Sequence, residues 1–303
     1  MRTAATRTWW LAIRPATLPA SASGVVVGLG AALATGAPFR PDTALGCLAV
    51  ALLLQVCANL ANDLSDFRRG ADGPTRLGPT RVAAAGLVTA RQLEIAIAVV
   101  IAVSCVVGGW LVLLGGPALM VLGAAAILAA LAYTGGPFPY GYHGLGELFV
   151  FVFFGLAAVI GTAELQSGQV EPLYVLAAIP VGALTTAILV VNNLRDTTTD
   201  RAAGKRTLAV MLGEDFARAE YAACLVVAWV VPVGIVAARW FGDALPASPL
   251  TLLPLLAVPV ALPLWRVVLA DGDPRRLNRV LRGTARLTLV FALLFAFGMA
   301  ASR

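Results

Sequence analysis

The amino-acid sequence predicts an all-α integral membrane protein, with nine transmembrane helices packed in a single bundle. Of its 303 residues, 59% are hydrophobic and only 13% are charged, and the mean hydropathy is +0.87. A water-soluble domain carries about 25% charged residues, because its surface must be solvated. Apolar segments close to the roughly 20 residues that span a bilayer recur along the whole chain. This composition excludes a soluble domain, a disordered chain and a disulfide scaffold.

The first fifteen residues are expected to form a short helix at the cytoplasmic membrane interface rather than a span. Their apolar stretch is interrupted at Arg14 and is too short to cross a bilayer. Trp9 and Trp10 are side chains that favour the depth of the lipid headgroups. The sequence therefore predicts an interfacial segment over residues 1–15, within one transmembrane domain that covers residues 1–303.

Nine apolar segments follow in order, and each ends at polar residues or at Gly and Pro. The third and fourth are separated only by a Gly-Gly-Pro sequence, which predicts a tight helical hairpin. The expected spans are 16–35, 43–62, 93–114, 117–133, 145–165, 172–193, 221–238, 249–270 and 284–301.

Basic residues fall on alternate loops and predict the orientation of the nine spans. With the N-terminus in the cytoplasm, eighteen of the 22 lysines and arginines lie on the cytoplasmic side. Cytoplasmic loops of membrane proteins carry such an excess. The two long charged loops, at 62–92 and 193–220, both lie on this side. We therefore expect a multi-pass protein of the cell membrane, with its N-terminus and its active site facing the cytoplasm.

The first cluster of acidic and amide side chains stands at the end of the second span. Asn59, Asn62, Asp63 and Asp66 are spaced at i, i+3, i+4 and i+7, and Asp72 follows a few residues later. If the helix continues, the first four share one face. The spacing predicts a group of oxygen ligands where the second helix leaves the membrane.

A second cluster stands at the end of the sixth span. Asn192, Asp196 and Asp200 are spaced at i, i+4 and i+8, again on one helical face, with Asn193 and Arg195 between them. Both clusters lie at the cytoplasmic ends of even-numbered spans. We therefore expect them to face each other across the bundle.

Carboxylates at the edge of the membrane need a strong compensating partner, because each costs about 2.5 kcal/mol or more near hydrocarbon. Oxygen ligands of this kind suit Mg²⁺, which proteins commonly share between carboxylates and a substrate phosphate. Basic side chains near the acidic ones would bind phosphate oxygens. They are Arg68, Arg69, Arg76, Arg81, Arg195, Lys205 and Arg206.

Two other interpretations of these clusters remain open at this point. Asp and Arg at membrane exits form surface ion pairs, and Asn residues cap helices. A cation-coupled membrane transporter also uses Asp and Asn within its helices. The location of both clusters at helix ends, with basic residues beside them, favours an anionic substrate over a cation.

At these residues the sequence resembles the UbiA superfamily of intramembrane aromatic prenyltransferases. The superfamily has an NDxxDxxxD-type motif after its second helix and a DxxxD-type motif after its sixth. Asn62-Asp63-x-x-Asp66 matches the first motif, and Asp196-x-x-x-Asp200 matches the second. The resemblance extends over about residues 9–213.

The first motif departs from the superfamily pattern at its end. Gly70 stands where the last Asp is expected, and the nearest carboxylate belongs to Asp72. Other motifs narrow the resemblance to the branch of 1,4-dihydroxy-2-naphthoate polyprenyltransferases, enzymes of menaquinone synthesis. They are Arg76-x-Gly78-Pro79-x-Arg81, Asn192-Asn193-x-Arg195-Asp196, Gly204-Lys205-x-Thr207 and Tyr142-His143-Gly-Leu-Gly-Glu147.

The resemblance implies a central cavity, a polyprenyl diphosphate donor, an aromatic acid acceptor and Mg²⁺ as the cofactor. The implied reaction transfers the polyprenyl group to 1,4-dihydroxy-2-naphthoate with loss of CO₂ and diphosphate, and gives demethylmenaquinol. The expected metal ligands are Asp63, Asp66, Asp72, Asp196 and Asp200. The expected diphosphate-binding residues are Asn59, Asn62, Arg76, Arg81, Asn192, Asn193, Arg195 and Lys205. The expected catalytic set is Asp66, Asp196, Asp200 and Lys205.

The loop after the fourth span supplies candidates for binding the acceptor. Tyr133 and Tyr142 would stack on or hydrogen-bond the bicyclic ring, and His143 and Glu147 would position or deprotonate a ring hydroxyl. The phenylalanines within 149–154 are expected to face lipid or other helices. An alternative within the same reaction class is another aromatic acceptor, such as 4-hydroxybenzoate.

Overall fold

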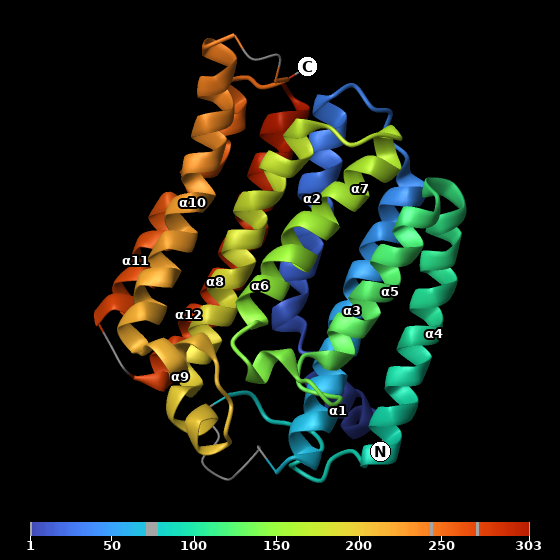
Figure 1. The fold of residues 1–303 in the computed structure, drawn as a ribbon, viewed down its shortest axis with the longest axis vertical. Coiled ribbons are helices and arrows are strands. Elements are labelled where there is room, and N and C mark those ends of the chain that lie inside the picture. Colours follow the sequence, from blue (N-terminus) through green and yellow to red (C-terminus); the bar gives the residue numbers. More distant parts are fainter. Residues whose placement is uncertain (1, 71–77, 243–244, 271–272, 303) are drawn as a thin grey trace.

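The computed structural model describes residues 2–70, 78–242, 245–270 and 273–302, and it contains no strand within these ranges. Its long helices stand side by side in one bundle (Figure 1). The α-helices, and the shorter 3₁₀ and π segments labelled η, are α1 (Arg2–Ile13), η1 (Pro15–Thr17), α2 (Leu18–Ala34), α3 (Pro41–Arg68), α4 (Ala90–Gly115), α5 (Pro117–Ala132), η2 (Tyr140–Tyr142), α6 (Gly146–Val150), η3 (Phe151–Ala157), α7 (Ala158–Ser167), α8 (Pro172–Ala202), α9 (Leu208–Leu212), α10 (Glu214–Trp240), η4 (Pro249–Ala257), α11 (Val258–Ala270) and α12 (Pro274–Ala300).

The predicted all-α integral membrane fold is confirmed. Within the described residues, eight helical segments are long and apolar enough to cross a bilayer. The ninth apolar helix, α5, has 16 residues and is about 24 Å long, against a hydrocarbon core of about 30 Å. The count of nine spans and the cytoplasmic N-terminus therefore stay predictions.

Several helices continue beyond the predicted spans at the end of the bundle that carries the acidic clusters, called the polar end below. α3 runs on to Arg68, α8 runs on to Ala202, and α12 begins at Pro274 after an Asp273 cap. Hydropathy detects only the apolar part of a helix, whereas charged turns can continue its backbone hydrogen bonding into the headgroup layer. Asp63 and Asp66 of the first cluster and Asp196 and Asp200 of the second therefore lie on helical turns rather than in loops.

The predicted hairpin between the third and fourth spans is confirmed. Thr89 begins α4 with a capping box, in which it exchanges hydrogen bonds with Gln92. Gly116 joins α4 to α5 with a φ of +89°, a conformation that L side chains rarely adopt. Pro117 then starts α5, where its missing N–H costs nothing.

The predicted span 145–165 is not one regular helix. α6 passes into the π-helical turns of η3, and α7 completes the span. A Cβ atom added at Gly155 would lie 2.6 Å from the Cα of Gly182 in α8, so this crossing needs glycine. Small residues allow such close approach of membrane helices.

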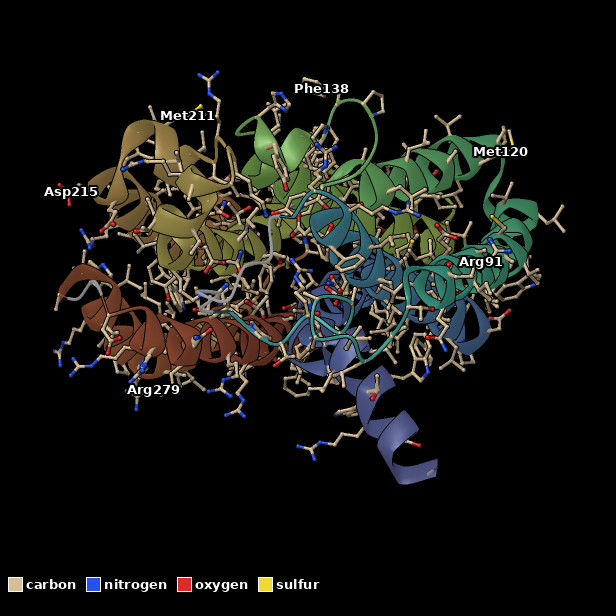
Figure 2. The ribbon with its side chains drawn as sticks, turned by 90° about the horizontal axis from the view of Figure 1, so that it is seen from below. Arg91, Met120, Phe138, Met211, Asp215 and Arg279 are labelled. Atoms are coloured by element: carbon tan, nitrogen blue, oxygen red, sulfur yellow. The ribbon has the colours of Figure 1, made fainter. Side chains whose placement is uncertain are left out.

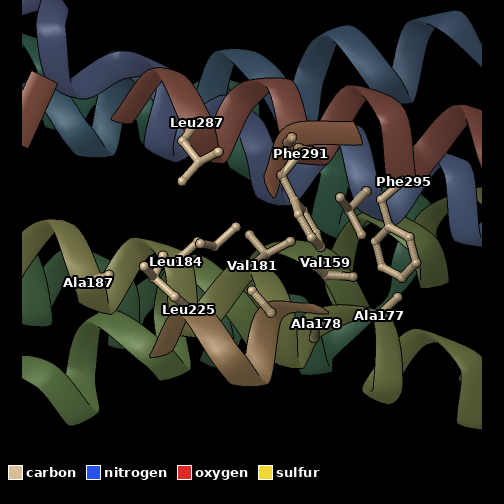
Figure 3. Packing of buried hydrophobic residues seen from close by; sticks show 14 of the residues in the cluster. Val159, Ala177, Ala178, Val181, Leu184, Ala187, Leu225, Leu287, Phe291 and Phe295 are labelled. Atoms are coloured by element: carbon tan, nitrogen blue, oxygen red, sulfur yellow. The ribbon is translucent and has the colours of Figure 1, made fainter. Parts of the chain in front are cut away.

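Helix α8 runs through the middle of the bundle and carries much of its buried core. Its Val181 and Leu184 face Leu287 and Phe291 of α12 and Leu225 of α10 (Figure 3). Lipid tails are as apolar as these side chains, so close packing rather than water exclusion holds such helices together. The packing fixes α8, and with it the second acidic cluster, against α10 and α12.

The N-terminal helix α1 projects from the bundle (Figure 2), while its last turn packs against α3. Trp10 is 63% exposed, whereas Trp9 packs on a small core with Ala12. Arg14 separates α1 from the next turn and has a φ of +54°, which is uncommon outside glycine. A separate helix is thus found where the interfacial segment was expected, and its location at the membrane surface stays a prediction.

Candidate active site

A cavity of about 1580 Å³ lies within the bundle and reaches the polar end. Side chains of both acidic clusters line it, although they are far apart in the sequence. Its charged residues within the described part of the chain are five basic and three acidic, a net formal charge of +2. They are Arg14, Arg81, Arg195, Lys205 and Arg282 with Asp66, Asp196 and Asp200. This end of the cavity is therefore suited to an anionic ligand.

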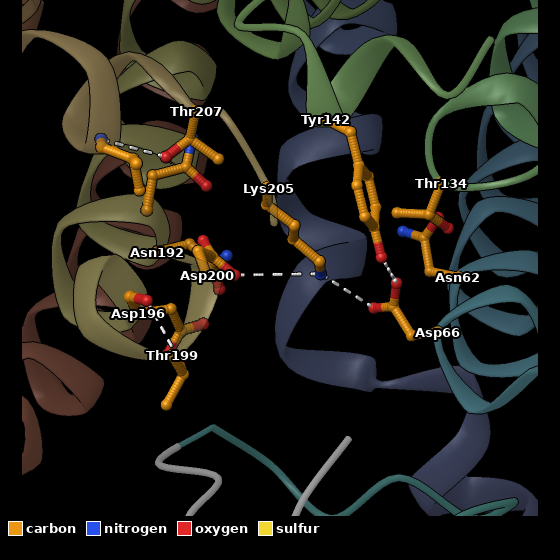
Figure 4. A network of polar contacts seen from close by, with 12 residues as sticks. Asn62, Asp66, Thr134, Tyr142, Asn192, Asp196, Thr199, Asp200, Lys205 and Thr207 are labelled. Atoms are coloured by element: carbon orange, nitrogen blue, oxygen red, sulfur yellow. Dashed lines mark hydrogen bonds and ion pairs between the residues drawn. The ribbon is translucent and has the colours of Figure 1, made fainter. Parts of the chain in front are cut away.

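Asp66 is the centre of the polar contacts on the α3 side (Figure 4). Its side chain is buried, and its Oδ2 lies 2.7 Å from Nη2 of Arg81 and 3.3 Å from Nζ of Lys205. Its Oδ1 accepts a hydrogen bond of 3.1 Å from the hydroxyl of Tyr142. Three loops or helix ends of the polar end thus meet at one carboxylate.

Asp63 has a different environment, although it is only one turn before Asp66. Its two carboxylate oxygens accept hydrogen bonds from the backbone N–H groups of Val82 and Ala83, at 3.0 and 3.1 Å. It is buried and is not among the residues that line the cavity. Asp63 therefore fastens the following loop to α3 and holds Arg81 beside the site.

The two asparagines of the first cluster connect α3 to its neighbours. Asn59 donates to the carbonyl of Ile13 at 2.8 Å and to the hydroxyl of Thr17 at 3.0 Å. Asn62 accepts a hydrogen bond of 3.0 Å from Thr134. Both asparagines also line the cavity, so each has a side toward the space between the acidic clusters.

The second cluster lies on α8, with Asn192, Asp196 and Asp200 all lining the cavity as their spacing predicts. Asp196 is bound at both oxygens by Arg195, at 2.8 and 2.5 Å. Asn193 also reaches the cavity, and its side chain donates to Glu147. The sequence prediction that the two clusters face one another is confirmed by this shared cavity.

Lys205 bridges the two sides of the site. Its Nζ lies between Oδ2 of Asp66 at 3.3 Å and Oδ1 of Asp200 at 3.8 Å (Figure 4). The loop after α8 sets this position, because the backbone N–H of Lys205 donates to the carbonyl of Asp200 and that of Arg206 donates to Tyr142. A single ammonium thus neutralises carboxylates from both motifs.

Tyr142 projects into the site from the loop after α5, and Tyr133 lines the cavity beside it. Two cations lie over the ring of Tyr142, with Lys205 Nζ at 4.9 Å and the guanidinium of Arg69 at 5.3 Å from its centroid. Burial, together with the nearby charge of Asp66, raises the pKa of Tyr142 well above its usual value. Its hydroxyl therefore stays protonated and donates to the carboxylate.

His143 and Glu147 lie outside the cavity lining. His143 is exposed, stacks on Phe138 and makes a 2.9 Å hydrogen bond with the carbonyl of Pro139. Glu147 is buried in the bundle, and its Oε1 accepts a 2.7 Å hydrogen bond from Asn193. Glu147 thus contacts the lining residue Asn193 from outside the cavity, whereas the side-chain partners of His143 do not line the cavity. Asp72 and Arg76, also singled out by the sequence, lie outside the described residues.

Several residues that line the cavity were not predicted from the sequence. Gln55 donates to Asn59 and accepts from Ser21, which extends the polar wall along α3 and α2. Gln55 stands seven residues before Asn62, a spacing that places both amides on the same face of one helix. This spacing could have identified Gln55 from the sequence. Asn278 of α12 had no such signal, because it lies far from both motifs in the sequence.

The phenylalanines of α6 and η3 correct another expectation. Phe149, Phe153 and Phe154 line the cavity, although they were expected to face lipid or other helices. Hydropathy is the same for a phenylalanine against lipid and for one against an apolar cavity, so the sequence could not separate the two. Their rings make the deeper part of the cavity suited to an apolar group.

The acidic side chains suit a metal that arrives with an anionic substrate. Among the described residues, no three Asp, Glu, His or Cys side chains form a group able to hold a metal ion. Mg²⁺, however, is commonly bound by one or two carboxylates together with substrate phosphates. Asp66, Asp196 and Asp200 border one cavity, and the ammonium of Lys205 already lies between two of them. The donor set therefore fits Mg²⁺.

The fold is that of solved UbiA homologues. A structure of a UbiA homologue from Aeropyrum pernix K1 has a TM-score of 0.63 at 19% identity, and the match covers 93% of this chain and 97% of that one. A UbiA homologue from Archaeoglobus fulgidus bound to GPP and Mg²⁺ has a TM-score of 0.61 at 13% identity, covering 97% and 99% of the two chains.

Sequence comparison identifies relatives that carry the name of one enzyme activity. The chain is 38% identical to the 1,4-dihydroxy-2-naphthoate octaprenyltransferase of Escherichia coli, over 97% of this chain and 95% of that protein. It is 41% identical to the Mycobacterium tuberculosis protein of the same name, over 96% of both chains. The profile of the UbiA prenyltransferase family matches residues 23–286, which hold both acidic clusters and most of the residues that line the cavity. This chain is therefore a member of the UbiA prenyltransferase family.

Proposed function

We propose that the protein transfers a polyprenyl group from polyprenyl diphosphate to 1,4-dihydroxy-2-naphthoate. The bond between the first prenyl carbon and the diphosphate oxygen breaks, and a bond forms between that carbon and the ring carbon that carried the carboxylate. CO₂ and diphosphate leave, and demethylmenaquinol is the product. Relatives that carry the name of this activity align with nearly the whole chain, which supports the assignment.

The observation that carries the proposal is the meeting of two distant acidic clusters at one end of a cavity with an apolar interior. The net charge of its described lining residues favours a diphosphate, and the phenylalanine wall favours an isoprenoid chain. A substrate with a diphosphate head and a polyprenyl tail matches both ends. A cation-coupled transporter fits this cavity poorly, because the basic residues would repel its substrate.

We propose that Mg²⁺ is held on the donor diphosphate by Asp66, Asp196 and Asp200, with Asp72 as a further ligand. Bound there, the metal would neutralise charge on the departing diphosphate. A homologue whose structure contains GPP and Mg²⁺ supports this use of a metal. Asp63 contributes by holding the loop of Arg81 in place.

The basic and amide side chains would hold the diphosphate in a fixed position. Arg81 and Lys205 already contact Asp66, so a diphosphate next to that carboxylate would lie within their reach. They would stabilise the negative charge that grows on the leaving group. Asn62 and Asn192 line the same space and would donate hydrogen bonds to diphosphate oxygens. Asn59, Asn193 and Arg76 complete the proposed set.

Tyr133 and Tyr142 are proposed to contact the naphthoate ring, because both line the cavity near the diphosphate position. Tyr142 would remain a hydrogen-bond donor during the reaction. His143 and Glu147 would act indirectly, by fixing the loop after α5 and the side chain of Asn193. We further propose that this site faces the cytoplasm from the cell membrane, as the distribution of basic residues predicts.

The test of this function is a choice of acceptors given to one preparation. Purified protein in liposomes receives Mg²⁺, a radiolabelled polyprenyl diphosphate and either 1,4-dihydroxy-2-naphthoate or 4-hydroxybenzoate, and the lipid-soluble product is counted. We expect product with the naphthoate alone. Product with 4-hydroxybenzoate alone would keep the reaction class and change the acceptor, and an absence of product with both acceptors would refute the proposed function.

A further inference from the structure

Arg195 pairs with its neighbour in the sequence in an uncommon way. Consecutive residues of a helix point about 100° apart and do not face each other. The guanidinium of Arg195 nevertheless bends back so that Nε lies 2.8 Å from Oδ1 of Asp196 and Nη2 lies 2.5 Å from Oδ2. A side chain folded in this manner needs other groups to hold it.

Two amides supply that support. Nη2 of Arg195 donates to Oδ1 of Asn192, and Nη1 donates to Oδ1 of Asn278, both at 2.8 Å. All three guanidinium nitrogens thus donate to protein oxygens. The side chain of Arg195 is only 1% exposed, whereas that of Asp196 is 13% exposed. Both residues line the cavity, and Asp196 is the more exposed of the two, whereas the guanidinium of Arg195 is almost fully enclosed by its acceptors.

Asn278 brings a third part of the chain to the site. It lies in the second turn of α12, between the buried Leu277 and the exposed Arg279, which points outward in Figure 2. Further along the same pair of helices, α12 and α8 are joined by apolar side chains such as Leu287 and Leu184 (Figure 3). The contact between Asn278 and Arg195 is where this interface becomes polar, at the edge of the cavity.

We propose that Asn278 is a positioning residue, which fixes the guanidinium of Arg195 and through it the carboxylate plane of Asp196. This inference rests on the proposed function, because Asp196 is there a ligand of the diphosphate-bound metal. It also changes the part expected of Arg195, which orients the ligand instead of binding the diphosphate itself.

The geometry explains how an amide two contacts away affects the metal. An ionised carboxylate offers about four lone-pair positions, and the arginine fork occupies one on each oxygen. The remaining positions of Asp196 are directed away from Arg195. Removal of the Asn278 oxygen would leave Nη1 of Arg195 buried without this acceptor. The guanidinium of Arg195 would then rotate toward another acceptor, and the carboxylate of Asp196 would rotate with it. Partners of this kind typically change metal affinity by about 10- to 100-fold.

The experiment measures metal binding in the full-length protein. Mn²⁺ replaces Mg²⁺ as the probe, an unreactive prenyl thiolodiphosphate supplies the diphosphate, and electron paramagnetic resonance counts the free metal. We expect Asn278→Leu to weaken Mn²⁺ binding by about tenfold. In the prenyl-transfer assay, the Mg²⁺ concentration for half-maximal rate should rise by a similar factor, while the KM for the acceptor stays unchanged.

Two further variants separate positioning from general damage to α12. Asn278→Asp keeps an acceptor oxygen toward Arg195, so its metal affinity should return to within about threefold of the wild type. Thr288→Val removes a buried hydroxyl of the same helix, which donates to the backbone carbonyl of Thr284, and this variant should bind Mn²⁺ normally. Where Asn278→Leu does not fold, as judged by its melting temperature, Asn278→Ala replaces it with the same expected loss.

Unchanged Mn²⁺ affinity in Asn278→Leu or Asn278→Ala would overturn the positioning role. An equal loss in Thr288→Val, or no recovery in Asn278→Asp, would overturn it as well, as would a wild-type protein that binds no Mn²⁺ with the analogue. Failure of the proposed function gives a different result: the wild type then binds Mn²⁺ and the donor analogue but prenylates no naphthoate. The metal measurement thus judges Asn278 independently of the acceptor.

Discussion

Asp66 is the residue on which the account of the site depends most. Arg81, Tyr142 and Lys205 reach it from three separate segments, and it is fully buried behind them. A buried carboxylate with this many partners is costly to remove, because each partner loses a charge-assisted contact. Its spacing from Asn62 identified it in the sequence, but nothing in the sequence indicated which cations would meet there.

Asp66→Asn should reduce prenyl transfer by about 10²- to 10³-fold, the range seen when one electrostatic contact to a reacting group is lost. The side chain keeps its size, so the fold should persist. The matched control is Asp42→Asn, an exposed acid near the other end of the same helix, which should retain full activity. Steady-state rates with saturating Mg²⁺ measure both. A wild-type rate in Asp66→Asn would contradict its role.

Tyr142 permits a test by pH. Because burial and Asp66 raise the pKa of its hydroxyl, the protonated donor should persist throughout the range in which an ordinary tyrosine begins to ionise, about pH 9 to 10. Tyr142→Phe should lower the rate about tenfold, since a hydrogen bond to a charged group is lost. Plotted against pH, the prenyl-transfer rates of the wild type and of Tyr142→Phe should run parallel from about pH 8 to pH 10. A fall in the wild type alone would mean that the hydroxyl ionises there.

At the scale of elements, helical periodicity predicted the site well and loops poorly. With about 100° per residue, Asn59, Asn62, Asp63 and Asp66 fall within one sector of α3, and Asp63 lies at its edge. The periodicity could not tell that the loop carrying Val82 covers that edge and takes up both oxygens of Asp63. The contact depends on where a distant loop folds, which local spacing does not encode.

Asp63 should therefore behave as a loop anchor in a graded series. Asp63→Ala leaves two buried N–H groups without acceptors, at about 1–3 kcal/mol each, whereas Asp63→Asn keeps one acceptor oxygen. Limited proteolysis with mass spectrometry should find cleavage at 78–88 increasing from wild type to Asn to Ala, with activity falling in the same order. Equal loss of activity in both variants with no change in cleavage would instead identify Asp63 as a metal ligand.

For the whole molecule, composition was enough to predict a helical membrane bundle, and the two motifs were enough to predict that its acidic clusters face each other. The central cavity was implied by the family resemblance. The sequence did not reveal which helices close that cavity. Asn278 and Phe153 resemble ordinary interfacial and apolar residues until packing brings them to its wall. Long-range packing of this kind leaves no periodic signal in the chain.

Orientation in the membrane is a prediction for the whole molecule. Arg201 lies in the last turn of α8, at the polar end of the bundle, and Gln169 lies in the loop that precedes α8, at the opposite end. Both side chains are exposed, and each can be replaced by cysteine, as Arg201→Cys and Gln169→Cys. If the polar end faces the cytoplasm, a membrane-impermeant maleimide should label Gln169→Cys in intact cells and reach Arg201→Cys only after lysis. The parent protein gives the background from its natural cysteines. The reverse pattern would place the active site on the outer side.

The most direct measurement of the central claim follows both products of one reaction. 1,4-Dihydroxy-2-naphthoate labelled in its carboxylate carbon is supplied with polyprenyl diphosphate to the purified protein in liposomes, and released CO₂ is compared with prenylated quinol. The account predicts equal amounts of the two, loss of both with EDTA, and recovery of both with added Mg²⁺. Prenylated product that keeps the labelled carboxylate, or product formation that is unaffected by EDTA, would contradict it.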